Sequence, residues 1–133
     1  MQNLDYLCMK YGQNILESAN IKKDDENVIT KALGVLQENG PYALFLYLEE
    51  KKKKDSDIAS NIYSSFIKLI KEDELKPFMA PPQGDKSIKE LTDWLIEISK
   101  DIDKLFLFKK IMEQTLLYAR YYAKALPESG DKS

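Results

Sequence analysis

Apolar residues recur every three or four positions along most of the chain, which is the spacing of one face of an α-helix. Leu4, Leu7, Tyr11 and Ile15 follow this register in the first stretch, and later stretches repeat it. The one Asn-Gly pair is not flanked by alternating apolar and polar residues, so β-hairpins are not indicated. The pattern therefore predicts an all-α protein.

Glycine, proline and capping residues divide this pattern into six helical segments. Asn3 is a candidate N-cap for the first helix, and Ser87 followed by Glu90 has the capping-box pattern. The Asn-Gly pair at residues 39–40 is typical of a helix C-terminus, and Pro41 suits the first turn of the next helix. The predicted segments are residues 3–19, 24–40, 41–48, 56–73, 87–100 and 101–126, the last starting at residue 101 or 103.

Three features predict how these segments pack. Segment 41–48 is apolar almost all round, so we expect it at the centre of the bundle or beneath a partner. Gly12, in the middle of the first helix, predicts a close helix crossing. Residues 75–84 contain three prolines and a glycine, which predicts a loop that Phe78 and Met79 fasten to the surface.

Length and composition indicate one domain. With 133 residues, of which 44% are apolar, the chain can bury a core without disulfides or metal. We predict a compact bundle of five to six helices over residues 1–126. Residues 127–133 begin with a proline, which ends the last helix, and continue with polar residues and one glycine, so we expect a disordered C-terminal tail there.

Composition also removes most catalytic chemistry. The chain has no His and one Cys, which excludes Ser-His-Asp and Cys-His catalysis, His-ligated zinc and an internal disulfide. It lacks the glycine-rich phosphate loops, which residues 84–87 resemble only superficially. The acidic runs 24–26 and 72–74 lack calcium-loop spacing, and we interpret them as solvated helix ends. We therefore predict a protein that is not an enzyme and needs no metal or cofactor.

The sequence gives no sign of a membrane partner. Its first residues lack the basic start and apolar run of a signal peptide. No apolar run approaches the ~20 residues that a membrane span requires. We expect a cytoplasmic protein.

Charge is distributed unevenly along the chain. The net charge is −2, yet residues 104–126 contain five cations against Glu113 alone, with aromatic residues between them. This segment is either a core helix whose lysines reach out to solvent, or a basic stripe along a nucleic-acid backbone with tyrosines available for stacking. On the second interpretation the candidate RNA-binding residues are Lys104, Lys109, Lys110, Arg120 and Lys124.

A second basic stretch lies at residues 51–54, which are four consecutive lysines with acidic residues on both sides. A solvated turn is the simpler interpretation, because charge runs are usually exposed and self-neutralised. The alternative is contact with phosphate groups by point charges.

Two segments together resemble a known family, the small helical subunit of type III-B CRISPR effector complexes. Residues 37–40 (Gln-Glu-Asn-Gly) match the turn that ends a helix in that family, with Pro41 where an apolar residue is usual. Residues 107–110 and 118–123 (Tyr-Ala-Arg-Tyr-Tyr-Ala) resemble its closing helix, with Tyr121 replacing a second basic residue. Length and helical character also agree.

The resemblance implies a specific role in antiviral defence. Members of the family are non-catalytic, and a few copies stack head to tail as a minor filament inside the effector ribonucleoprotein. They contact the backbone subunits and the large polymerase-like subunit, and they touch the phosphates of guide and target RNA. In such systems base pairing reads the sequence while protein holds the RNA backbone.

Three other assignments stay open at this point, of which an enzyme that uses carboxylates has the least support, because no convergent polar cluster is visible in the sequence. The chain is also compatible with the type III-A counterpart subunit, which gene neighbours would distinguish. The third assignment is a helical protein-interaction adaptor unrelated to RNA, which would bind its partner through the apolar segment 41–48.

Overall fold

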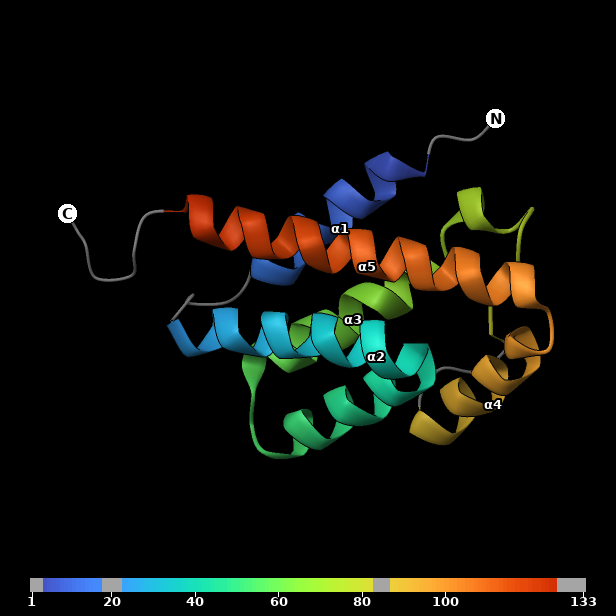
Figure 1. Ribbon diagram of the computed structural model, residues 1–133, viewed down its shortest axis with the longest axis horizontal. Coiled ribbons are helices and arrows are strands. Elements are labelled where there is room, and N and C mark those ends of the chain that lie inside the picture. The colour runs from blue at the N-terminus through green and yellow to red at the C-terminus, as the bar shows by residue number, and fades with distance from the viewer. Residues whose placement is uncertain (1–3, 18–22, 83–86, 127–133) are drawn as a thin grey trace.

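The computed structural model describes residues 4–17, 23–82 and 87–126, and these residues form an all-α bundle without strands (Figure 1). Helices α1, α2 and α4 contact α5, and α3 packs against α1 and α2. The predicted fold class is therefore confirmed. The elements are α1 (Asp5–Glu17), α2 (Lys23–Lys53), α3 (Asp57–Ile70), the 3₁₀ turn η1 (Asp73–Leu75), α4 (Ile88–Ser99) and α5 (Ile102–Ala125).

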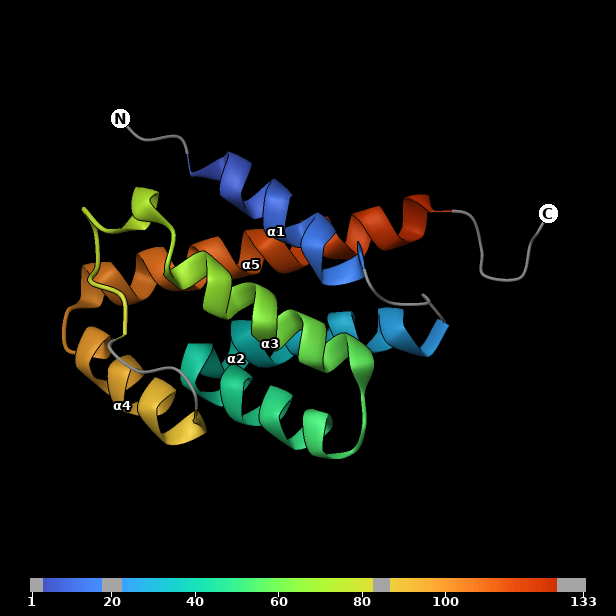
Figure 2. The same ribbon diagram turned by 180° about the vertical axis from the view of Figure 1, so that it is seen from behind.

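Helix α2 consists of two arms that meet at Gly40. This glycine has φ 91° and ψ 178°, so the helix is interrupted there although hydrogen bonding continues on both sides. A positive φ of this size favours glycine, and Pro41 starts the second arm, where a missing N–H costs little. The predicted break at residues 39–40 is confirmed, and the chain changes direction at this point (Figures 1 and 2).

The core forms where the apolar faces of α1, α2, α3 and α5 meet. Ile15, Phe45, Phe66 and Phe108 are completely buried, one from each of these helices. The Phe45 ring meets Phe66 and Tyr63 edge to face, at centroid distances of 6.1 Å and 5.7 Å. Each such side chain contributes ~1.5–3 kcal/mol through burial, so the periodic stripes supply the main stabilisation of the fold.

Helix starts follow the capping signals in the sequence. The Ser87 hydroxyl accepts from the Glu90 amide at 3.2 Å, and the Glu90 carboxylate accepts from the Ser87 amide at 3.3 Å, which completes the predicted capping box of α4. Ser56 caps α3, and Asp101 caps α5. The predicted cap Asn3 and the tail over residues 127–133 lie outside the described residues.

Gly12 allows α1 and α5 to cross closely, as predicted. A Cβ atom at this position would lie 3.0 Å from the Tyr118 Cβ and 3.2 Å from the Thr115 carbonyl oxygen. These separations are shorter than ordinary carbon contacts of ~3.5–4.0 Å. The glycine therefore sets how near the two helices approach.

Two expectations about predicted helical segments are met only in part. One side of the second arm of α2 lies in the core, where Leu44 and Phe45 are buried, while Tyr42 is 44% exposed and Leu46 is 46% exposed. Only the side of this arm that packs on neighbouring helices is covered. The alternative expectation, a partner over the exposed side, stays a prediction. The predicted helix 56–73 ends earlier, at Ile70, because Glu72 adopts an extended conformation before η1 begins.

The loop after η1 is held by Met79 and by Trp94. Met79 is buried, as expected, whereas Phe78 stays partly exposed. The Trp94 indole donates to the Ala80 carbonyl at 2.9 Å and packs edge to face on Phe108. These contacts place Phe78 beside α1 and α5, where it lines a cleft. Within the described ranges no helix is both long and apolar enough to cross a membrane.

Candidate nucleic-acid interface

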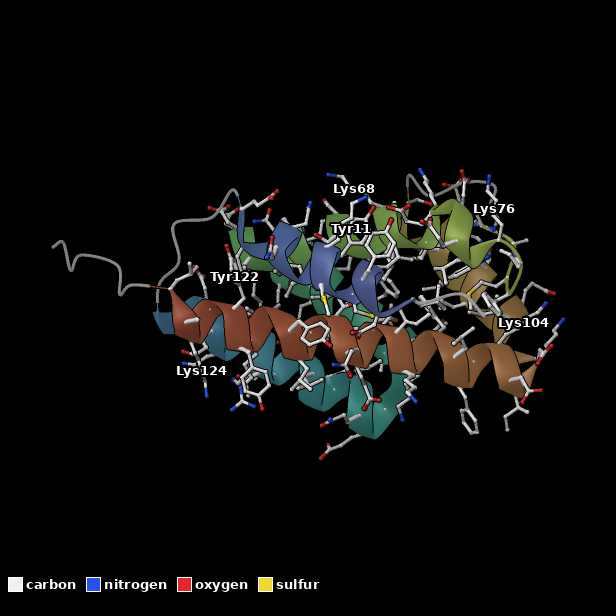
Figure 3. The ribbon with its side chains drawn as sticks, turned by 90° about the horizontal axis from the view of Figure 1, so that it is seen from above. Tyr11, Lys68, Lys76, Lys104, Tyr122 and Lys124 are labelled. Atoms are coloured by element: carbon white, nitrogen blue, oxygen red, sulfur yellow. The ribbon has the colours of Figure 1, made fainter. Side chains whose placement is uncertain are left out.

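The five candidate cations of α5 do not share one face. Lys104 and Lys124 lie near opposite ends of the helix (Figure 3). At 3.6 residues per turn, Lys109, Arg120 and Lys124 fall within ~60° of one another around the axis, while Lys110 is ~100° from Lys109. The five positions therefore split into a group on the α2 side and residues that point elsewhere.

The group beside α2 is engaged within the protein. The Lys109 ammonium donates to the Gln37 carbonyl of α2 at 3.3 Å. The Lys124 ammonium lies 3.8 Å from a carboxylate oxygen of Glu26, also on α2. The Nε atom of Arg120 is buried and has no hydrogen-bond partner among the described residues. Part of the basic charge on α5 thus serves the α2–α5 contact.

A different combination of basic and aromatic residues faces outward. We define the outer stripe as Phe106, Lys110, Tyr121 and Lys124, which are separated by 4, 11 and 3 positions. These spacings place all four within ~60° around the axis and along ~27 Å of helix. Phe106 and Tyr121 are each 60% exposed, and both lysines are exposed. The stripe thus offers two ring faces and the Lys110 cation to one elongated partner, together with Lys124, whose ammonium also lies 3.8 Å from Glu26.

The other tyrosines of α5 have different surroundings. The Tyr118 hydroxyl donates to an Asp5 carboxylate oxygen at 2.8 Å, which joins α5 to the start of α1. That hydrogen bond is the main cause of the raised pKa of Tyr118. Tyr122 is 36% exposed and lies near the C-terminal end of the helix (Figure 3). Tyr121 is therefore the tyrosine best placed to stack on a ligand.

The lysine run 51–54 is largely paired within its own corner of the molecule. The Lys52 ammonium lies 3.9 Å from the Tyr63 ring centroid and 3.5 Å from the Glu49 carboxylate. Lys51 lies over the Tyr47 ring at 5.7 Å, and Lys54 pairs with Glu50 at 3.4 Å. The predicted solvated turn is corrected in part: Lys51, Lys52 and Lys53 form the last helical turn of α2, only Lys54 belongs to the turn that follows, and the run is partly neutralised by these contacts.

The acidic run 72–74 likewise has structural partners. Glu72 accepts hydrogen bonds from Tyr11 and from Lys10, the latter at 3.1 Å. The hydrogen bond from Tyr11 is the main reason why the pKa of Glu72 is lowered, and Lys10 adds to the effect. Burial raises the pKa of Tyr11 in turn. The group joins α1 to the segment before η1 (Figure 3).

The remaining acidic residues do not assemble a metal site in the described part of the chain. Asp73 pairs with Lys76 at 2.9 Å, and Glu74 accepts from Tyr6 at 3.0 Å. No group of three or more potential ligand residues is found in this part. The Asp24 side chain and the phosphate-loop-like residues 84–86 lie outside what the structure describes.

A cleft between α1, α5 and the loop after η1 has no counterpart in the sequence analysis. It has a volume of about 340 Å³. Three stretches far apart in the chain supply its walls, so periodicity within one helix does not reveal it. The lining residues are Leu4, Asp5, Cys8, Phe78, Leu107, Lys110, Ile111 and Gln114.

Comparisons with protein-family models, curated proteins and solved structures found no match to this chain.

Proposed function

We propose that this protein is a non-catalytic subunit of a type III-B CRISPR effector ribonucleoprotein in the cytoplasm, where it contacts the backbone of guide and target RNA. The assignment to this complex comes from the resemblance over residues 37–40, 107–110 and 118–123. The observation that carries the RNA contact is the outer stripe of α5, with its alternating exposed cations and aromatic rings.

The chemistry of the stripe suits binding that does not depend on sequence. Lysine ammonium groups neutralise phosphates as point charges and contribute most of the salt-dependent affinity. Exposed aromatic rings stack on any base and add ~1–3 kcal/mol for each stacked base. Lys110 lies between Phe106 and Tyr121 along the helix, so one strand that follows α5 meets a ring, a cation and a ring in order.

The contacts within the protein refine the list of candidate residues. Lys104, Lys110 and Lys124 are the cations that we assign to RNA, because they lie at the helix ends or on the outer stripe. Lys109 contacts α2 instead, through the Gln37 carbonyl, and the Nε atom of Arg120 is buried; Lys124 stays on the list because its side chain is exposed, although it also lies near Glu26. Three cations in a chain of net charge −2 imply weak affinity for the isolated subunit. Firm binding then requires the assembled complex.

The proposed partners of this subunit are the backbone subunits, the large polymerase-like subunit and further copies of this chain. Charge segregation supports such contacts, since residues 104–126 carry net positive charge while the remainder of the chain is acidic. Exposed cations of α5 in one copy that meet acidic residues of the next copy would give a head-to-tail contact, which extends as a filament.

The direct test is the double substitution Lys104→Glu with Lys110→Glu, studied in the free chain and in the assembled complex. We expect the affinity for a guide–target duplex to fall at least about tenfold, because two phosphate contacts become repulsive. The matched control is Lys31→Glu with Lys68→Glu, which makes the same charge change at exposed positions of α2 and α3. Equal losses in both variants, or no loss in either, contradict the proposal.

A second candidate function is a protein-interaction adaptor, and the second arm of α2 supports it. Tyr42 and Leu46 are one turn apart, and each is nearly half exposed. An aromatic and an aliphatic residue at this spacing are typical anchors for a partner helix or groove. Leu46→Asp would then abolish capture of one stoichiometric protein partner, whereas RNA binding would be absent from the unsubstituted chain as well.

A further inference from the structure

The cleft between α1, α5 and the loop after η1 has the properties of a small-ligand site. Its volume of about 340 Å³ falls within the range of ~300–1,000 Å³ that is usual for such sites. Leu4, Phe78, Leu107 and Ile111 make its walls mostly apolar. Apolar walls with a few polar groups bind a flat ring by burial and orient it by hydrogen bonds.

The Cys8 thiol closes the cleft as a further apolar surface. It is buried, and its Sγ donates to the Ile111 carbonyl at 3.5 Å. Burial raises the pKa of this thiol, so it stays protonated near neutral pH. A protonated thiol is a poor nucleophile, so we expect the cleft to bind a ligand without forming a covalent bond to Cys8.

Three polar side chains then define what the cleft recognises: Asp5, Lys110 and Gln114. The Asp5 carboxylate is held in place by the Tyr118 hydroxyl at 2.8 Å. A carboxylate accepts hydrogen bonds, while the lysine ammonium attracts an anion. The complementary ligand thus combines an apolar body, an amino donor and a negative group.

Lys110 connects this cleft to the outer stripe, since it belongs to both. An RNA phosphate held by Lys110 leaves its own base within reach of the cleft, on the α1 side of the stripe. A base that is not paired can be splayed out of the strand and recognised on its edges.

We propose that the cleft takes an unpaired RNA base bearing an exocyclic amino group, whose phosphate lies on Lys110 and whose amino group donates to Asp5. This inference rests on the proposed function, because the outer stripe brings the strand to the cleft. Cytosine fits this description and uracil does not, since uracil carries a carbonyl oxygen where cytosine has its amino group. The site thereby adds base preference to an otherwise sequence-independent surface.

The test compares two RNA duplexes that differ only in one bulged nucleotide, cytosine or uridine, with a bulge-free duplex as reference. We expect the unsubstituted chain to bind the cytosine bulge at least about fivefold more tightly than the uridine bulge, which is the low end for one good base contact. Fluorescence anisotropy at fixed salt measures all three affinities. Equal affinities for the two bulges overturn the inference.

Substitutions separate the cleft from the stripe. Leu107→Trp fills the cleft, and we expect it to remove the preference for cytosine while binding of the bulge-free duplex is retained. Leu105→Trp is the matched control, because Leu105 is also a half-buried leucine of α5 but does not line the cleft and lies ~100° or more around the helix axis from the outer stripe. Asp5→Asn keeps an oxygen for Tyr118 and removes the carboxylate, so it should also bring the cytosine-to-uridine ratio close to one.

The possible failures are distinguishable. If the chain and its assembled complex bind none of the duplexes, the proposed function is wrong. If they bind all duplexes and Leu107→Trp leaves the preference unchanged, only the cleft assignment is wrong. If Leu107→Trp instead abolishes self-association of the chain in sedimentation, with no base preference at any stage, the cleft holds a side chain of a second copy and the inference is overturned.

Discussion

Two glycines inside helices occupy opposite environments, one crowded and one open. A Cβ at Gly12 would meet Tyr118, Thr115 and Ala119 at 3.0–3.2 Å, and two of these three atoms belong to the backbone. A Cβ at Gly34 would meet nothing within 4 Å. The same change of glycine to alanine should therefore have opposite effects at these two positions.

We expect Gly12→Ala to lower the free energy of unfolding by about 1–2 kcal/mol, because the overpacking cost exceeds the gain in helix propensity. Gly34→Ala should raise it by up to about 1 kcal/mol, since only propensity changes there. Urea unfolding followed by circular dichroism measures both. Stabilisation by Gly12→Ala would show that α1 and α5 separate without cost.

A second contrast concerns the two tyrosines of α1 that bind carboxylates. Tyr11 is buried and donates to Glu72, whereas Tyr6 is exposed and donates to Glu74. The pKa of Glu72 is lowered in the folded state. A carboxyl group of this kind stabilises the fold above its unfolded pKa of ~4.3, and that stabilisation is lost as the pH falls through the lower folded value.

We therefore expect Tyr11→Phe to reduce the free energy of unfolding by about 1 kcal/mol near pH 7. The difference from the unsubstituted protein should shrink as the pH falls below the unfolded pKa of ~4.3 and through the lower folded pKa of Glu72, because protonation removes the carboxylate that accepts from Tyr11. Denaturant unfolding at several pH values tests this. Tyr6→Phe is the control and should change stability by less than about 0.5 kcal/mol. An effect of Tyr11→Phe that does not vary with pH would contradict the role given to Glu72.

At the element scale, local signals in the sequence predicted helix starts and breaks well. The capping box of Ser87 and Glu90 and the break before Pro41 depend on residues only a few positions apart. The direction of each α5 cation was not predictable in this way, because it depends on where α2 lies. Lys109 contacts a carbonyl 72 positions away, and no periodicity within α5 encodes that contact. The cleft escaped prediction for the same reason.

The backbone conformation of Gly40 at the break in α2 leads to a testable prediction. Gly40 has nothing near its would-be Cβ, so a side chain there is opposed only by the backbone conformation at φ 91° and ψ 178°. Gly40→Ala should lower the free energy of unfolding by about 1–3 kcal/mol. Thermal and urea unfolding, with Asn39→Ala at the exposed neighbouring position as control, test this. A neutral result would mean that the two arms straighten without loss of packing.

At the scale of the whole molecule, net charge and charge placement give different expectations for RNA binding. A net charge of −2 predicts that the chain as a whole attracts nucleic acid weakly. The fold changes this expectation, because Lys110 is exposed on α5, whereas Lys109 donates to a carbonyl of α2 and the exposed Lys124 also lies near Glu26 of α2. The number of cations that reach phosphate is thus smaller than the number in the sequence of α5.

The salt dependence of RNA affinity reports how many of those cations contact phosphate. Each phosphate contact contributes about −0.7 to the slope of log affinity against log salt for single strands. If Lys104, Lys110 and Lys124 make the contacts, the slope should be about −2, whereas all five cations of α5 would give about −3.5.

Lys110→Gln should make the slope less steep by about one contact, while Lys109→Gln should leave it unchanged and weaken the packing of α2. Anisotropy titrations with a single-stranded RNA between 50 and 200 mM salt, the range over which phosphate contacts change affinity most visibly, decide between the two counts. A slope near −3.5 that loses one contact with Lys109→Gln would mean that Lys109 leaves the Gln37 carbonyl to bind RNA.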